Sequence, residues 1–194
     1  MIEMDLSGKK EEIAQLSLSW KNYLPGMIYG PLLIAQFITV FFFYNYYHLD
    51  ICTWIGWGII IFFLLLVGLH KKEFKDKGEI HKDKDKSFIN TTKLVDTGVY
   101  SIIRHPLWLC WILLSISLTL ISQHWLIVVF AVPICCIVYG ETYFLDKGLV
   151  KKFGEEYKKY KKKVPRMNLI LGLIKYVFLK KNCNSTGFPN SENK

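Results

Sequence analysis

The sequence predicts an all-α protein: a polytopic integral-membrane helical bundle with four spans and a possible fifth, shorter helix. Apolar residues make up 52% of the 194-residue chain, which is too hydrophobic for an ordinary small soluble domain. Several long segments also lack any formal charge. As helices rising about 1.5 Å per residue, they can cross the roughly 30 Å hydrocarbon core of a bilayer.

The first two spans are predicted at residues 24–47 and 51–69, which carry no formal charge. Residues 1–22 are polar and of mixed charge, without the features of a cleavable signal, so we expect the first span to stay in the protein. We also expect a short interfacial helix around residues 13–20. Residues 70–93 are dominated by Lys, Asp and Glu, which predicts a solvated extension of the second span followed by a loop.

The third and fourth spans come from 35 uncharged residues between His105 and Glu141, in which residues 122–124 are the only polar cluster. This pattern predicts a membrane hairpin with helices at about 106–122 and 125–141. The fold-back brings the triplet Arg104, His105 and Pro106 level with Glu141 at one bilayer face. Polar groups that converge in apolar surroundings indicate a functional site.

The distribution of positive charge orients the bundle. The 25 Lys and Arg residues divide into three before the first span, nine between spans two and three, and thirteen after span four. Both termini and the site are therefore predicted to be cytoplasmic. The net charge of +9 favours membrane lipids, and not nucleic acid, as the partner of these lysines. The five cysteines include no CxxC pair, and we expect neither a metal site nor disulfides.

After the fourth span, apolar residues recur at helical spacing: Leu149, Phe153, Tyr157, Tyr160 and Val164. They predict an amphipathic helix on the cytoplasmic membrane surface, with the two tyrosines as packing residues. Residues 168–179 form the shorter fifth helix, interfacial or re-entrant, with a fifth span as the alternative. We expect a single domain over 1–181 and a disordered tail over 182–194.

Two segments resemble a known family. Residues 94–106, LVDTGVYSIIRHP, are similar to the LVxxGxYxxxRHP signature of the isoprenylcysteine carboxyl methyltransferases and the related phospholipid methyltransferases. Residues 153–166 resemble that family's FGxEYxxYxxxVPR segment. The resemblance covers residues 94–166 and implies a membrane enzyme that uses S-adenosylmethionine. The chain departs from the family at Trp108 and Cys110, where the family has tyrosine and glycine, and its EExxL element falls here on Leu145 and Asp146.

The resemblance implies a cofactor site. Pro106 suits the first turn of a helix, which places His105 at the N-cap, with free backbone amides able to bind the cofactor carboxylate beside the Arg104 guanidinium. Either Glu141 or Asp146, or both, would accept hydrogen bonds from the ribose or the ammonium group. The cofactor-binding residues expected are Val95, Gly98, Tyr100, Arg104, His105, Pro106, Leu107, Glu141 and Asp146.

The acceptor is expected to be lipophilic, a small molecule or a prenylated peptide, and most simply a carboxylate of isoprenylcysteine type held by Arg166. Such a carboxylate needs no base, because it is ionised above a pKa of about 4. A phospholipid amine is the alternative, with Glu141 or His105 removing its proton. Two further hypotheses are a membrane enzyme resembling the sterol reductases, which uses a nicotinamide cofactor, and a non-catalytic membrane scaffold.

Overall fold

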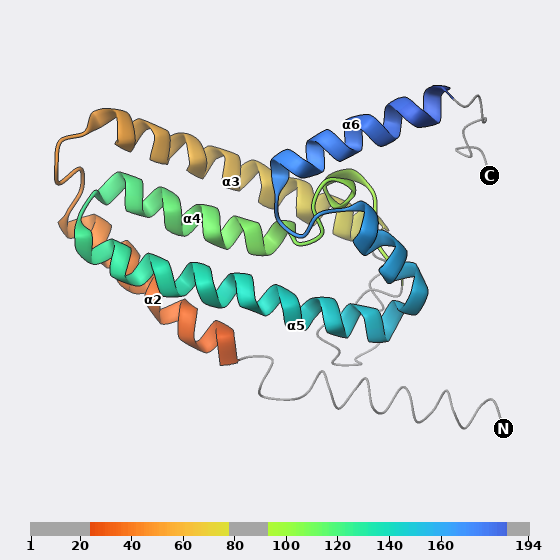
Figure 1. Cartoon of the computed structure of the whole chain (residues 1–194). Helices are drawn as coiled ribbons and strands as arrows, with labels where there is room; N and C mark the ends of the chain where they lie inside the picture. The colour runs from red at the N-terminus through yellow and green to blue at the C-terminus, as the bar shows by residue number, and fades with distance from the viewer. Residues whose placement is uncertain (1–23, 78–92, 186–194) are drawn as a thin grey trace.

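The computed structural model describes residues 24–77 and 93–185, and within them every regular element is a helix. Four helices form an elongated bundle: α2 (Leu24–Phe42), α3 (Asp50–Lys77), α4 (Pro106–Ser122) and the first part of α5 (Trp125–Lys163). A short 3-10 helix, η2 (Gly98–Ser101), precedes α4. The last helix, α6 (Leu169–Ser185), leaves the bundle at the end away from the α4–α5 turn (Figure 1).

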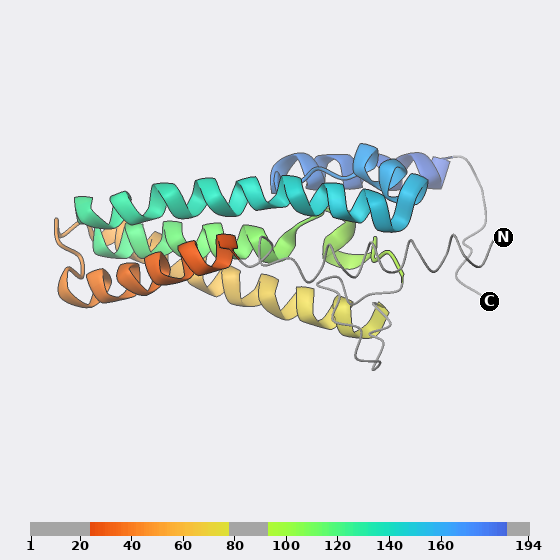
Figure 2. The ribbon, with the colours of Figure 1, turned by 90° about the horizontal axis from the view of Figure 1, so that it is seen from below.

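The core of the bundle lies around α4, which contacts α2, α3 and α5. Figure 2 shows these helices running alongside one another for most of their length. Cys110, Leu114, Leu118 and Ile121 of α4 are buried, because these positions, three or four residues apart, share one side of the helix. The hairpin predicted at residues 106–122 and from 125 onward is therefore present.

The outer surface of the bundle is apolar. Large apolar side chains are widely exposed, among them Phe41 at 84%, Ile51 at 77% and Trp54 at 75%, far beyond the apolar patches that soluble monomers carry. Within the described residues, α2, α3 and α5 are long and apolar enough to cross a bilayer, and α4, with 17 residues, is slightly shorter. These features confirm the predicted all-α membrane bundle.

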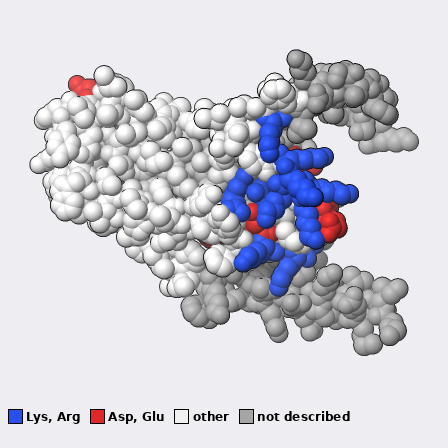
Figure 3. Space-filling model, viewed as in Figure 1, with Lys and Arg blue, Asp and Glu red and all other residues white. Residues whose placement is uncertain are grey.

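Charged side chains gather at one end of the molecule, while most of the visible surface elsewhere is uncharged (Figure 3). This end holds the last part of α5, including the three consecutive lysines Lys161, Lys162 and Lys163. The uneven distribution is the one expected when the uncharged length of the bundle lies in hydrocarbon and the charged end lies in water.

At the opposite end, hydrogen bonds of Gln123 connect the α4–α5 turn to the segment between α2 and α3 and the start of α3. Its Nε2 donates to Asn45 Oδ1, the Leu49 carbonyl and Thr53 Oγ1 at 2.8 to 2.9 Å, and its Oε1 accepts from the Leu49 amide. The residue has a positive φ of 60°, as the left-handed end of α4 requires. The polar interruption that marks the hairpin in the sequence is thus a structural connector.

The helix predicted after the fourth span is present, but its apolar face is covered by the protein and was expected to lie on the membrane surface. α5 continues past residue 141 as one helix to Gly154, where φ 58° and ψ −128° break the helical geometry. Only glycine adopts this conformation readily. The bend returns the apolar face of residues 155–164 to the protein, so that Tyr157 is 1% exposed and Tyr160 8% exposed. This face packs on the site and not on a membrane.

The fifth helix is present as α6 and extends to Ser185, beyond the domain end predicted at residue 181. Its residues up to Phe178 expose many apolar side chains, including Ile170 at 72% and Phe178 at 65%. The interfacial helix predicted around residues 13–20 and the last part of the predicted tail lie outside the described residues.

Candidate functional site

The backbone joins the two segments that carry the resemblance. The Arg104 amide donates to the Pro165 carbonyl at 3.1 Å, and the His105 amide donates to the Arg166 carbonyl at 3.2 Å. The Tyr160 hydroxyl adds a bond to the Tyr100 carbonyl at 2.6 Å. Segments about 60 residues apart in sequence therefore lie side by side at the charged end of the bundle. The His105 amide is occupied by this pairing and is not one of the free amides expected at the start of α4.

Asp146 is the centre of the site. Its carboxylate is 2% exposed and accepts hydrogen bonds from four side chains. Arg104 Nη1 lies 2.8 and 2.9 Å from its two oxygens, His105 Nε2 lies 2.9 Å from Oδ1, and the Tyr157 hydroxyl lies 2.6 Å from Oδ1. Asp146, and not Glu141, is thus the carboxylate that meets the Arg-His-Pro triplet.

Arg166 completes the cluster from the other side. Its Nε and Nη2 donate to Asp146 Oδ2 at 3.2 and 3.0 Å, and its guanidinium lies 3.5 Å from the centre of the Tyr143 ring. Lys161 Nζ is 3.9 Å from the same oxygen. One carboxylate therefore faces two guanidinium groups and an ammonium, which leaves the cluster with an excess of positive charge.

Burial sets the protonation of the neighbouring groups. It lowers the pKa of His105 below its usual value, against the opposing effect of the hydrogen bond to Asp146. A neutral imidazole that bonds a carboxylate through Nε2 carries its proton on that nitrogen, which leaves Nδ1 as an acceptor. Burial also raises the pKa of Tyr100, so this hydroxyl stays protonated and bonds His70 Nδ1 at 2.7 Å.

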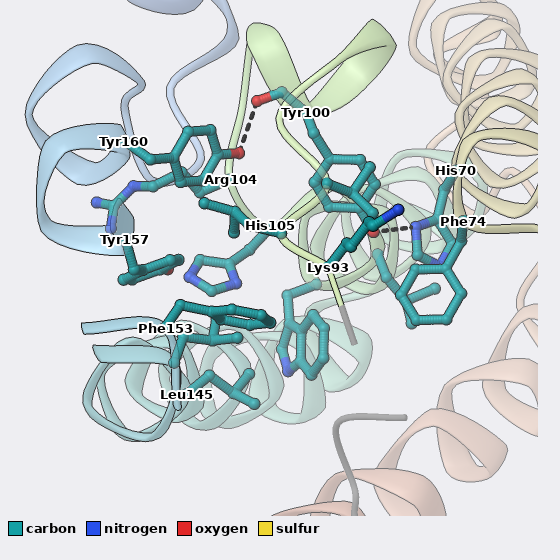
Figure 4. A pocket seen from close by; sticks show the side chains of 15 residues that line it. His70, Phe74, Lys93, Tyr100, Arg104, His105, Leu145, Phe153, Tyr157 and Tyr160 are labelled. Carbon is teal, nitrogen blue, oxygen red and sulfur yellow. Dashed lines mark hydrogen bonds between the residues drawn. The ribbon is translucent and has the colours of Figure 1, made fainter. Parts of the chain in front are cut away.

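A cavity of about 330 Å³ opens beside the cluster. Figure 4 shows His105 between the side chains of Tyr157 and Arg104 and those of Tyr100, His70 and Phe74, which come from different elements. The remaining wall is largely apolar. The full lining consists of His70, Phe74, Lys93, Leu94, Val95, Tyr100, Arg104, His105, Leu107, Trp108, Leu145, Leu149, Phe153, Tyr157 and Tyr160.

The structure places the predicted site residues in three groups. Val95, Tyr100, Arg104, His105 and Leu107 line the cavity. Pro106 and Asp146 are buried behind that lining, and Asp146 bonds the lining residues Arg104 and His105. Arg166 bonds Asp146 from the other side. Gly98 and Glu141 do not line the cavity. Gly98 has a positive φ of 56°, and a side chain there would collide with the carboxylate of Glu73, so its role is to shape the loop.

Several lining residues were not expected from the sequence. Tyr157 and Tyr160 were assigned to packing, yet both line the cavity and both hydroxyls bond the site. Their position inside the second segment was the available signal. His70 and Phe74 reach the cavity from the end of α3, and no spacing in the sequence links α3 to the segment after it.

The fold and site together define a helical membrane protein with a cavity where two separated segments meet at one end of the bundle. The chain belongs to the family described as "Protein of unknown function (DUF1295)", whose model matches residues 19–164.

Among curated proteins, the chain is similar to "Protein-S-isoprenylcysteine O-methyltransferase" of Mus musculus and of Rattus norvegicus, each 38% identical over 85 residues, and to that of Homo sapiens, 36% identical over 85 residues. The match covers 39% of this chain and 27% of each relative. The chain thus spans well under a third of the length of these relatives. No solved structure matches it.

Proposed function

We propose that this protein transfers a methyl group from S-adenosylmethionine to a lipophilic acceptor at the cytoplasmic face of a membrane. One observation carries the proposal: the two segments that resemble the methyltransferase family meet at a cavity with a cationic edge and apolar walls. The names of the partly matching relatives support the same reaction class.

The residues present fit this cofactor. Arg104 Nε is buried without a hydrogen-bond partner, although Nη1 of the same guanidinium is held by Asp146. An unused buried donor beside a surplus of positive charge suits the cofactor carboxylate. The cavity volume lies within the usual range for small-molecule sites, about 300 to 1,000 Å³, and Leu145, Leu149 and Phe153 offer apolar contacts to the adenosine.

The bound cofactor would supply an activated methyl group on a sulfonium. The protein's contribution would be binding, alignment and exclusion of water. In this proposal Asp146 fixes the orientation of Arg104 and His105, and the bend at Gly154 closes one side of the cavity, with Phe153 just before it and Tyr157 after it. The acceptor would enter laterally from the bilayer.

Two acceptor classes follow from this proposal. The names of the relatives favour a carboxylate of isoprenylcysteine type, which is already ionised and requires only alignment. An amine on an amphiphile is the second class, for which the half-buried Glu141, whose Oε2 has no hydrogen-bond partner among the described residues, could take up the proton.

The proposal is tested by thermal unfolding of the purified protein in detergent. S-adenosylhomocysteine at 100 times its dissociation constant should stabilise the folded protein by about 2.7 kcal/mol. Arg104→Lys, which removes the Nε donor but keeps the charge, should weaken that stabilisation, and the surface variant Lys158→Gln should retain it.

A parallel titration with a phosphorylated nicotinamide dinucleotide separates the reductase hypothesis. Stabilisation by that dinucleotide, with no response to S-adenosylhomocysteine, would contradict the proposed function. A response to neither compound would contradict it as well and would favour the scaffold hypothesis.

A further inference from the structure

Two cations, Lys161 and Arg166, contact Asp146 but do not line the cavity. Together with Arg104 they face a single carboxylate, and within the described part of the chain none of the three has another counter-ion. A ligand in the cavity can reach Arg104, which lines it. The positive charge of Lys161 and Arg166 lies on the outer side of Asp146, and a ligand in the cavity does not neutralise it.

Both cations can bind a second anion while Asp146 keeps its place. Lys161 Nζ is 3.9 Å from Asp146 Oδ2, which is too far for a hydrogen bond, and the Lys161 side chain is 43% exposed. Arg166 donates to Asp146 through Nε and Nη2, so this carboxylate does not use Nη1. A planar guanidinium can hold one anion along one edge and another along the next.

Two tyrosines of α5 accompany the Arg166 guanidinium. Arg166 Cζ lies 3.5 Å from the ring centre of Tyr143 and 5.9 Å from that of Tyr139. Tyr139 is 45% exposed and Tyr143 49% exposed, so the two rings face the surroundings of the bundle and not its core. Tyrosine is enriched at the level of the lipid head groups. The two cations and the two rings are therefore placed where the head groups of a bilayer lie.

The same face of α5 continues as an apolar stripe toward the other end of the bundle. Its exposed members are Val128, Val132, Tyr139 and Tyr143, which lie within roughly 60° of one another at about 100° per residue. At a rise of about 1.5 Å per residue, the stripe is about 22 Å long. Any spanning helix exposes apolar side chains to lipid, but this stripe ends at two cations. A ligand that covers both parts has an acyl chain and an anionic head group.

We propose that Lys161, Arg166, Tyr139 and Tyr143 form a binding site for an anionic phospholipid, with the phosphate on the two cations and an acyl chain along the stripe. The lipid is bound and not chemically changed, and the inference does not depend on the proposed methyl transfer. Since Arg166 also holds Asp146, the bound phosphate would support the cluster from its outer side. General attraction between lysines and an anionic membrane is different, because it does not single out Lys161.

The test measures how the unfolding temperature of the purified protein, in a neutral detergent, depends on the concentration of an added lipid. Dioctanoyl phosphatidylglycerol is the anionic probe, dioctanoyl phosphatidylcholine has the same chains without a net charge, and glycerol phosphate has the phosphate without chains. The decisive variant is Lys161→Gln, with Lys161→Met as a second variant that removes the charge. The matched control is Lys162→Gln, which removes the same charge at the next exposed position, roughly 100° further around the helix.

We expect phosphatidylglycerol to stabilise the wild type at lower concentrations than phosphatidylcholine does, and glycerol phosphate to have no effect at those concentrations. Loss of one charge-assisted contact should weaken the binding of phosphatidylglycerol about tenfold in Lys161→Gln and in Lys161→Met. Lys161→Arg, which keeps the charge, should retain the binding. In Lys162→Gln the affinity should change less than about twofold, whereas general attraction would lower it about fivefold for either lysine.

The inference is overturned if substitutions at Lys161 and Lys162 weaken the binding equally, or if phosphatidylcholine binds as tightly as phosphatidylglycerol. Equal stabilisation by glycerol phosphate would also overturn it, because the site would then be one for free phosphate. Circular dichroism without added lipid checks that each variant is folded. Stabilisation by S-adenosylhomocysteine is a separate measurement, and its absence would contradict the proposed function while leaving the lipid site standing.

Discussion

Replacing Asp146 with asparagine tests the organisation of the site, because this carboxylate accepts six hydrogen bonds from four side chains. Asparagine keeps the shape of the side chain but removes the charge, and its amide group places donors where two arginines already donate. The side chain of Arg104 is 6% exposed, so its guanidinium would remain buried without a counter-ion.

Removing one partner of a buried ion pair costs about 3 to 5 kcal/mol. The lower part of this range applies to Asp146→Asn, because the Arg166 side chain is 16% exposed and can turn toward water. We therefore expect a loss of about 3 kcal/mol in the free energy of unfolding, together with loss of stabilisation by S-adenosylhomocysteine.

Unfolding would be followed by circular dichroism during titration with sodium dodecyl sulfate in mixed micelles. Asp50→Asn is the control, because Asp50 is an exposed acid at the other end of the bundle that accepts one bond, from Asn45; it should change the free energy of unfolding by less than about 0.5 kcal/mol. A loss below about 1 kcal/mol for Asp146→Asn, with cofactor-product binding intact, would show that Asp146 does not hold the site together.

Three further outcomes are expected. Gly154→Ala should lower the free energy of unfolding by about 1 to 3 kcal/mol, because alanine is strained at φ 58° and ψ −128°, whereas Gly140→Ala, in open space within the helix, should be neutral or slightly stabilising in the same titration. Burial lowers the pKa of His105 in the folded state, so the unfolded state binds the proton more readily. The free energy of unfolding should therefore fall as the pH drops below about 6.5. His105→Gln should flatten this dependence in a pH series of unfolding curves. Gln123→Ala should lower stability by about 1 to 3 kcal/mol through the lost bonds to the α2–α3 turn but leave the affinity for S-adenosylhomocysteine, measured by calorimetry, unchanged.

The hairpin was predictable because hydrophobic sequence and membrane thickness together limit its geometry. The polar residues 122–124 stop α4 at Ser122 and start α5 at Trp125, as their pattern indicates. The end of α5 was not predictable in the same way. Beyond residue 141 the charges end the hydrophobic signal but not the helix, because lysine and glutamate are good helix formers in water. The direction of the bend at Gly154 depends on what Tyr157 and Tyr160 pack against, which local sequence does not specify.

The carboxylate partner of His105 was predicted five residues too early, at Glu141 and not at Asp146. Counting equal rises along two straight antiparallel helices brings residue 105 level with Glu141. Residues 103–105 are not part of α4, however, and a non-helical chain advances about 3.3 Å per residue compared with about 1.5 Å in a helix. These residues therefore reach past the end of the hairpin to Asp146, where the backbone bonds to residues 165 and 166 hold them.

The same geometry changes the role assigned to Arg166. The sequence suggested that this arginine holds an acceptor carboxylate, but its Nε and Nη2 are engaged with Asp146 and its guanidinium stacks on Tyr143. An acceptor carboxylate would have to take these donors from Asp146 and weaken the bonds that join the two halves of the site. Arg166 is thus one of the residues through which Asp146 joins the two segments of the site.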